Sequence, residues 1–137
     1  MKVTRVSPTN IGLVWPQIEH FINSAFATEL GDEDPVQVRK ELSNGDAQLW
    51  VIHSASGIKA AGITRISIVP AGRRVCFCVA LGGEDLPSWV EALDREASKF
   101  AKDYHCNSIR VTGRPGWKRV MKPLGYKESF VIVEKAL

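Results

Sequence analysis

Apolar residues in the first third of the chain recur mostly at helical spacing. Residues 2–6 alternate between polar and apolar side chains, which predicts a short strand. The apolar positions of residues 11–30 fall on one stripe, so they predict an amphipathic helix that Asn10 can cap. Asp34 is a second cap signal, followed directly by a proline, and it predicts a short helix over residues 35–44.

The middle of the chain changes to the period of strands. Three stretches, at residues 48–53, 58–69 and 73–81, are separated by short glycine-containing turns. The third stretch is predicted to place four apolar side chains on one face: Val75, Phe77, Val79 and Leu81. Consecutive strands joined by short turns predict an antiparallel meander.

A strongly amphipathic helix is predicted after the meander, over residues 88–104. Ser88 and Glu91 have the spacing of a capping box at its start. Three further elements are predicted: a strand at 108–112, a helix at 114–124 and a strand at 126–135. The order of elements predicts an α+β fold, with one mixed, mainly antiparallel sheet of about six strands flanked by four helices.

Length and composition fit one folded domain spanning residues 1–137. Hydrophobic residues make up 45% of the chain and charged residues 24%, which argues against disorder. No apolar run approaches the roughly 20 residues of a membrane-spanning helix, and the first residues lack a secretory signal, so we expect a cytoplasmic protein without a membrane partner. The net charge of +3 gives no strong case for nucleic acid.

Three cysteines are present, and their spacing matches no common zinc pattern. Cys76 and Cys78 lie two residues apart on a predicted strand, and His105 precedes Cys106. An odd number of cysteines does not indicate a disulfide framework. We therefore predict buried or half-buried free thiols and no metal site.

The predicted order of elements resembles that of the GCN5-related N-acetyltransferases over essentially the whole chain. Two local features carry the resemblance. One is the strand at 73–81, which passes through glycines into a long helix, and the other is Leu124-Gly125-Tyr126 before the final strand. The resemblance implies the fold of this family, acetyl-CoA as cofactor, and acetyl transfer to an amine substrate that the sequence does not identify.

The same resemblance implies a cofactor site at the end of the third meander strand. The backbone of residues 79–81 would hold the pantetheine and the following loop the pyrophosphate. The implied cofactor-binding residues are Val79, Ala80, Leu81, Gly82, Gly83, Glu84 and Asp85. The loop departs from the family pattern, since its two carboxylates repel phosphate and Pro87 lacks an N–H donor. A glycine turn followed by helix-capping acids is the alternative interpretation.

Acyl transfer needs a base for the amine and often uses an acid for the leaving thiolate. Glu84 and His53 are the candidate catalytic residues, with Asp85 as a further candidate base. Helix-capping acids explain Glu84 and Asp85 equally well, and a surface histidine is the more usual explanation of His53. Many family members place a tyrosine acid four residues before the signature glycine, where this chain has Met121. Tyr126 is expected in the core, and Trp89 is expected to pack on the sheet.

These departures keep a second function open, that of a non-catalytic protein with a degenerate active site on the same fold. The chain also resembles the short acyltransferase-like proteins that tailed bacteriophages carry in or on the virion. In that case its partners would be phage structural or other proteins, and it would be found in the virion. A third hypothesis, with less support than these two, is action on or near nucleic acid through the basic last helix.

Overall fold

The computed structural model describes residues 1–27, 31–113 and 116–137. Its centre is a five-stranded sheet in the order β1-β2-β3-β4-β5. The strands are β1 (Lys2–Val6), β2 (Gln48–Ser54), β3 (Gly57–Ile68), β4 (Arg74–Gly83) and β5 (Ser108–Val111). Neighbouring strands from β1 to β4 are antiparallel, and β5 runs parallel to β4. The predicted α+β class, meander and mixed sheet are confirmed.

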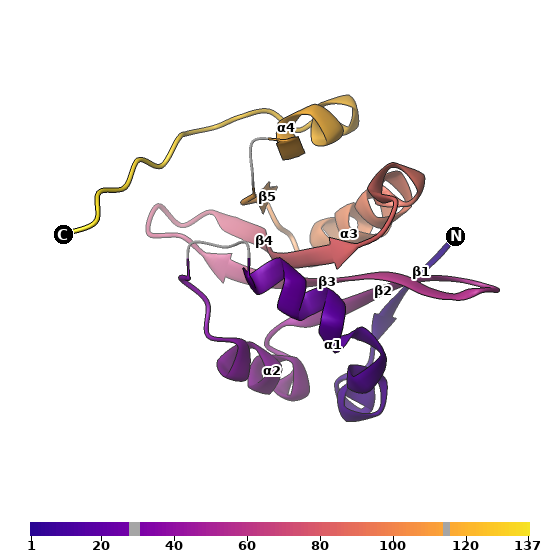
Figure 1. The fold of residues 1–137 in the computed structure, drawn as a ribbon. Helices are drawn as coiled ribbons and strands as arrows, with labels where there is room; N and C mark the ends of the chain where they lie inside the picture. Colours follow the sequence, from indigo (N-terminus) through magenta and orange to yellow (C-terminus); the bar gives the residue numbers. More distant parts are fainter. Residues whose placement is uncertain (28–30, 114–115) are drawn as a thin grey trace.

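Helices cover both faces of the sheet (Figure 1). The α-helices are α1 (Ile11–Ala27), α2 (Pro35–Asn44), α3 (Val90–Asp103) and α4 (Gly116–Met121), and the 3₁₀ turns are η1 (Pro8–Asn10), η2 (Leu86–Ser88) and η3 (Lys122–Leu124). Helices α1 and α2 lie on one face, and α3 and α4 lie on the other. None of the helices in the described ranges is both long and apolar enough to cross a membrane.

Local signals explain where most helices begin and end. The Asp34 carboxylate accepts a hydrogen bond from the Val36 N–H at 3.0 Å, as predicted for the cap of α2. Gly45 follows α2 with φ of 83°, a left-handed conformation that glycine adopts without strain. Asn10 is not a free-standing cap, because it closes η1, which runs directly into α1.

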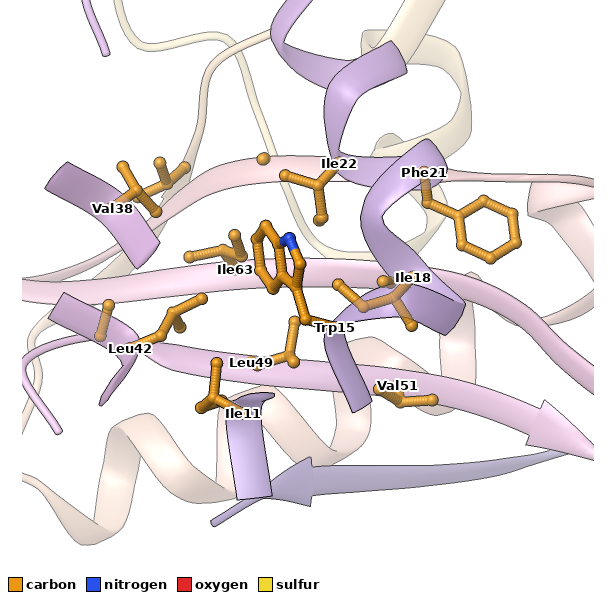
Figure 2. Packing of buried hydrophobic residues seen from close by; sticks show 14 residues of the cluster. Ile11, Trp15, Ile18, Phe21, Ile22, Val38, Leu42, Leu49, Val51 and Ile63 are labelled. Carbon is orange, nitrogen blue, oxygen red and sulfur yellow. The ribbon is translucent and has the colours of Figure 1, made fainter. Parts of the chain in front are cut away.

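The larger core lies between the sheet and the α1–α2 layer. Figure 2 shows Trp15 of α1 at its centre, surrounded by aliphatic side chains from both helices and from the strands. Ile18, Leu49 and Ile63 are each 0% exposed, which marks this layer as the tightly packed part of the molecule. The opposite face buries Trp89 and Met121 beneath α3 and α4.

Two sequence predictions are wrong. Residues 126–135 form no strand, so the sheet has five strands rather than six, because no backbone hydrogen bond in the described residues joins this segment to β5. The capping box also fails: the Ser88 hydroxyl donates to the Asp85 carbonyl at 2.8 Å, within η2, and α3 starts two residues later. The predicted end of α1 and start of α4 touch residues 28–30 and 114–115, which lie outside the described residues.

Candidate functional site

Strands β4 and β5 separate midway along β4. Their parallel pairing runs from Val75 with Ser108 to Cys78 with Val111, whereas β4 itself continues to Gly83. Beyond Cys78, β4 therefore has hydrogen-bonded neighbours only on the β3 side, within the described part of the chain. A strand with one unpaired edge offers N–H and C=O groups to an extended ligand.

A β-bulge marks the point where the two strands separate. Ile63 pairs with Ala80 and Thr64 pairs with Cys78, so Val79 is an extra residue without a partner in β3. The prediction that Val79 and Leu81 share one face of β4 is therefore wrong. Val79 packs in the α1-side core, whereas Leu81 packs against the α3-side cluster. Nothing in the sequence around Val79 signals this bulge.

The two glycines that follow are packed rather than open. A Cβ on Gly82 would lie 2.2 Å from the backbone oxygen of Phe21 in α1. A Cβ on Gly83 would lie 2.2 Å from the Cβ of Ala60 in β3. Both glycines therefore allow α1 and β3 to approach the end of β4 closely, whereas the predicted role was to let a pyrophosphate approach the backbone.

Many backbone groups of the loop after β4 form hydrogen bonds within the protein. The Glu84 N–H donates to the Lys59 carbonyl at 3.2 Å, and the Glu84 carbonyl accepts from Nε1 of Trp89 at 2.6 Å. Asp85 has a left-handed φ of 53°, and its carbonyl accepts two bonds from Ser88. The Glu84 amide is thus already committed to the sheet and is not directed at a ligand.

The N-terminus of α3 lies directly behind this loop. Trp89 is its cap residue, and the Trp89 side chain makes no capping hydrogen bond to the first N–H groups of the helix. Uncapped amides and the helix dipole favour an anion there, but Glu91 in the first turn opposes one. A groove of about 440 Å³ also runs between α3 and η3, where Arg95, Lys99 and Lys102 are partly offset by Glu91 and Asp94.

The two predicted catalytic residues do not meet. Both lie at the same end of the sheet, but β3 runs between them, since His53 pairs with Ile58 and the Glu84 N–H bonds to Lys59. Two strand spacings correspond to roughly 10 Å. Nε2 of His53 is also 2.8 Å from Oγ1 of Thr4 on the edge strand β1. These two residues therefore form no acid–base pair.

The α1–α2 connection is tied to the sheet by charge. Arg65 of β3 bonds Glu41 of α2 through two nitrogens at 2.8 Å each, and Nη2 also lies 3.0 Å from Glu33. The hydrogen bond to Glu41, followed by that to Glu33, raises the pKa of the Arg65 guanidinium against an opposing effect of burial. This cluster fixes Glu33 and the α2 residue Glu41 on the α1–α2 face of the sheet.

Comparisons with known proteins agree on the architecture. No protein-family model matches the sequence, and no curated protein matches it. An aminoglycoside acetyltransferase from an uncultured soil metagenomic sample superposes with a TM-score of 0.74 at 13% identity, covering 99% of this chain and 97% of that one. An aminoglycoside antibiotic 6′-N-acetyltransferase from Acinetobacter haemolyticus gives 0.71 at 16% identity, covering 100% and 98%.

A third structure, a predicted acetyltransferase from Clostridium acetobutylicum solved with acetyl-CoA, gives a TM-score of 0.63 at 17% identity and covers 98% of this chain and 95% of that one. The chain has the fold of the GCN5-related N-acetyltransferases. Identities this low establish the fold alone, so activity has to be argued from this chain's own residues.

On this acetyltransferase fold, Met121 and Tyr126 share one cavity. The cavity has a volume of about 40 Å³ beneath α3, and its lining also includes Cys78, Leu81 and Asp94. Met121 is 7% exposed and carries no proton to donate. Tyr126 instead brings a phenolic hydroxyl to the cavity and donates it to the Asp94 carboxylate at 2.6 Å. Burial, followed by this hydrogen bond, raises the pKa of Tyr126 well above its usual value.

The cysteines of this acetyltransferase-fold chain are thiols, buried at Cys76 and half-buried at Cys78 and Cys106, as predicted. No group of three metal-ligating side chains occurs in the parts of the chain that the structure describes. Burial raises the pKa of Cys76 from 9.0 to about 11, and Cys106 adds to the effect. The buried thiol therefore stays neutral over a range in which an unfolded chain would carry a thiolate.

This shift predicts an alkaline loss of stability. Unfolding lets Cys76 ionise, so the unfolded state binds fewer protons between pH 9 and 11 and stability falls by about 1.4 kcal/mol per pH unit there. Urea unfolding at pH 8 and pH 10 should show a smaller fall for Cys76→Ala than for the wild type. Val75→Ala is the control, since Val75 is the buried neighbour of Cys76 on β4 and carries no titratable group. Equal falls for the Cys76→Ala variant and the wild type would contradict the assignment.

Proposed function

We propose that the protein binds an acyl-CoA, with an acetyl group as the simplest case, and transfers the acyl group to an amine. The observation that carries the proposal is the open edge of β4, which starts at the unpaired bulge residue Val79 where β5 turns away. An extended amide chain such as pantetheine matches this edge, because it can pair with a strand through N–H and C=O groups.

The reaction sets the remaining requirements. The amine nitrogen attacks the thioester carbonyl, the C–N bond forms, the C–S bond breaks, and a proton moves from the nitrogen to the thiolate. Backbone N–H groups along the open edge of β4 beyond the bulge would stabilise the carbonyl oxygen as charge develops on it. Tyr126 is the phenol nearest to the strand separation within the described chain, and base roles for Glu84 and His53 stay predictions.

The pantetheine of an acyl-CoA fits this chain better than the diphosphate does. The pantetheine fits the open β4 edge at residues 79–81. The diphosphate would lie at the uncapped N-terminus of α3, with the cations of the α3–η3 groove beyond it. Gly82 and Gly83 do not form a cradle, because both are packed against backbone, and the exposed carboxylates of Glu84 and Asp85 oppose the phosphates. We therefore expect weak binding that depends on salt.

Thermal unfolding with acetyl-CoA tests the proposal. Acetyl-CoA at 100 times its dissociation constant should raise the free energy of unfolding by about 2.7 kcal/mol and raise the melting temperature accordingly. Replacing both carboxylates, as Glu84→Gln with Asp85→Asn, should tighten binding about fivefold at low salt by removing repulsion. Asparagine also tolerates the left-handed backbone at position 85.

A control separates local repulsion from net charge. Asp32→Asn with Asp46→Asn makes the same change in total charge at exposed positions of the α1–α2 side. This control should leave the dissociation constant unchanged within twofold. A melting temperature that does not respond to millimolar acetyl-CoA, in the wild type and in the Glu84→Gln/Asp85→Asn variant, would refute the proposal.

The alternative of a non-catalytic, protein-binding component of a phage particle stays a prediction. One observation favours it: the loop at 84–88 satisfies its own backbone groups instead of directing them at a ligand. It would be preferred if the Glu84→Gln/Asp85→Asn variant failed to bind acetyl-CoA while a purified phage structural protein bound the wild type.

A further inference from the structure

The small cavity beneath α3 reaches β4 at the point where β5 separates from it. Cys78 lines this cavity and also belongs to the last residue pair between β4 and β5. Its volume is about 40 Å³, and its wall includes these apolar side chains: Leu81 of β4, Leu93 and Ala97 of α3, Val111 of β5 and Met121 of α4. The cavity therefore lies beside the start of the open edge of β4.

The β-bulge removes side chains from the cavity side of β4. In a regular strand successive side chains alternate between the two faces. Val79 and Ala80 instead both pack in the α1-side core, whereas Cys78 and Leu81 line the cavity on the α3 side. Gly62 of β3, which pairs with Leu81, adds no side chain there either. The backbone of residues 79 and 80 is therefore not covered on the cavity side by its own side chains.

The polar groups in the cavity wall already have hydrogen-bond partners. The Tyr126 hydroxyl donates to Asp94 at 2.6 Å. Nε1 of Trp50 donates to Oγ1 of Thr64 at 2.9 Å, and this threonine hydroxyl donates to Gln48 at 2.8 Å. Among the described residues, no buried side-chain nitrogen or oxygen lacks a partner. Because water in a cavity needs roughly two to four polar partners, this wall favours an apolar occupant.

We propose that this cavity holds the hydrocarbon end of the transferred acyl group, and that the protein prefers short acyl groups such as propionyl and butyryl over acetyl. This inference rests on the proposed binding of an acyl-CoA along residues 79–81. A water-sized group needs roughly 10–15 Å³, so a cavity of about 40 Å³ takes about three non-hydrogen atoms. The propyl group of butyryl matches this size, whereas the methyl group of acetyl leaves most of the cavity empty.

The preference should appear in the dissociation constants. Each methylene that is buried raises affinity about fourfold. Butyryl has two methylenes more than acetyl, so butyryl-CoA should bind about 15-fold more tightly than acetyl-CoA. Octanoyl-CoA should bind more weakly than butyryl-CoA, because its chain exceeds the cavity and can enter only by displacing packed side chains.

Titration calorimetry with these three thioesters tests the preference. Ala97→Leu adds a side chain at the cavity wall, so it should bring butyryl-CoA to within about twofold of acetyl-CoA. Ala92→Leu is the matched control, because it makes the same change on α3 at a residue outside the cavity wall, and it should keep the 15-fold difference. Val111→Ala enlarges the cavity and should narrow the gap between octanoyl-CoA and butyryl-CoA, which provides a second test if the Ala97→Leu variant does not fold.

Xenon tests the cavity without any coenzyme. Dissolved xenon should shift the methyl resonances of Leu81, Leu93 and Val111 in the wild type, as an apolar cavity without water binds it, and Ala97→Leu should abolish these shifts. A wild type without these shifts would overturn the proposal. If acetyl-CoA binds and butyryl-CoA binds no more tightly, the proposed preference is wrong while the proposed function stands. If neither thioester binds, the proposed function is refuted and the acyl preference with it, even where xenon enters the cavity.

Discussion

Replacing Gly82 with alanine is expected to lower the free energy of unfolding by about 3 kcal/mol. The new Cβ would lie 2.2 Å from the Phe21 oxygen and 3.0 Å from its carbonyl carbon, both in the backbone of α1. A helix backbone cannot move aside as a side-chain tip can, so α1 has to shift off the sheet and open the α1-side core. Gly83→Ala should behave similarly, because its Cβ would lie 2.8 Å from the Ala60 Cα and from the Lys59 oxygen.

Gly12→Ala is the matched control. Gly12 lies in α1 with nothing within 4 Å of an added Cβ, so alanine should raise stability by up to about 1 kcal/mol through helix propensity. Urea unfolding followed by circular dichroism measures all three variants. If Gly82→Ala costs no more than a few tenths of a kcal/mol, the close contact between β4 and α1 is not present in solution. Because Gly82→Ala and Gly83→Ala affect folding, neither of these two variants serves to test cofactor binding.

Trp89→Ala is expected to cost about 4 kcal/mol, the largest loss from any single side chain beside the candidate site. Trp89 is 1% exposed, the largest fully buried side chain in the described residues, and it fills the layer between α3 and the sheet. Its Nε1 also donates to the Glu84 carbonyl at 2.6 Å, so one residue supports both the core and the loop.

Two further variants separate these roles. Trp89→Phe keeps most of the bulk and loses the bond to Glu84, so it should cost about 1 to 2 kcal/mol and increase hydrogen exchange in residues 84–88. Trp117→Ala should cost less than Trp89→Ala, because Trp117 is only half-buried. Thermal and urea unfolding give the ranking. A Trp117 variant less stable than the Trp89→Ala variant would mean that α4, rather than α3, holds this layer.

The sequence was a good guide wherever one segment carries its own signal. Period-2 and period-3.6 patterns located the strands from β1 to β5 and the helices, and Asp34 was correctly identified as a cap. Burial of Trp89 was also predicted, because a large apolar residue on an amphipathic stripe faces the core. The order of these elements was sufficient to predict the fold.

What the sequence did not reveal depends on pairs of segments. The bulge at Val79 exists only in relation to the register of β3, and the end of β5 pairing at Cys78 depends on where two strands diverge. Glycine is needed at 82 and 83 because the backbones of α1 and β3 pack against these positions. The sequence predicted a ligand-binding loop there instead. The distance between His53 and Glu84 likewise follows from β3 lying between them.

The segment at 126–135 shows the limit most plainly. Its residues favour a strand, but strand propensity describes how a side chain suits a sheet and supplies no partner for the backbone. Local periodicity therefore determined which elements this chain makes and in what order. Only the tertiary structure decided which edges are paired, which glycines are packed and where β4 loses its β5 neighbour, because hydrogen bonds between strands join residues far apart in the sequence.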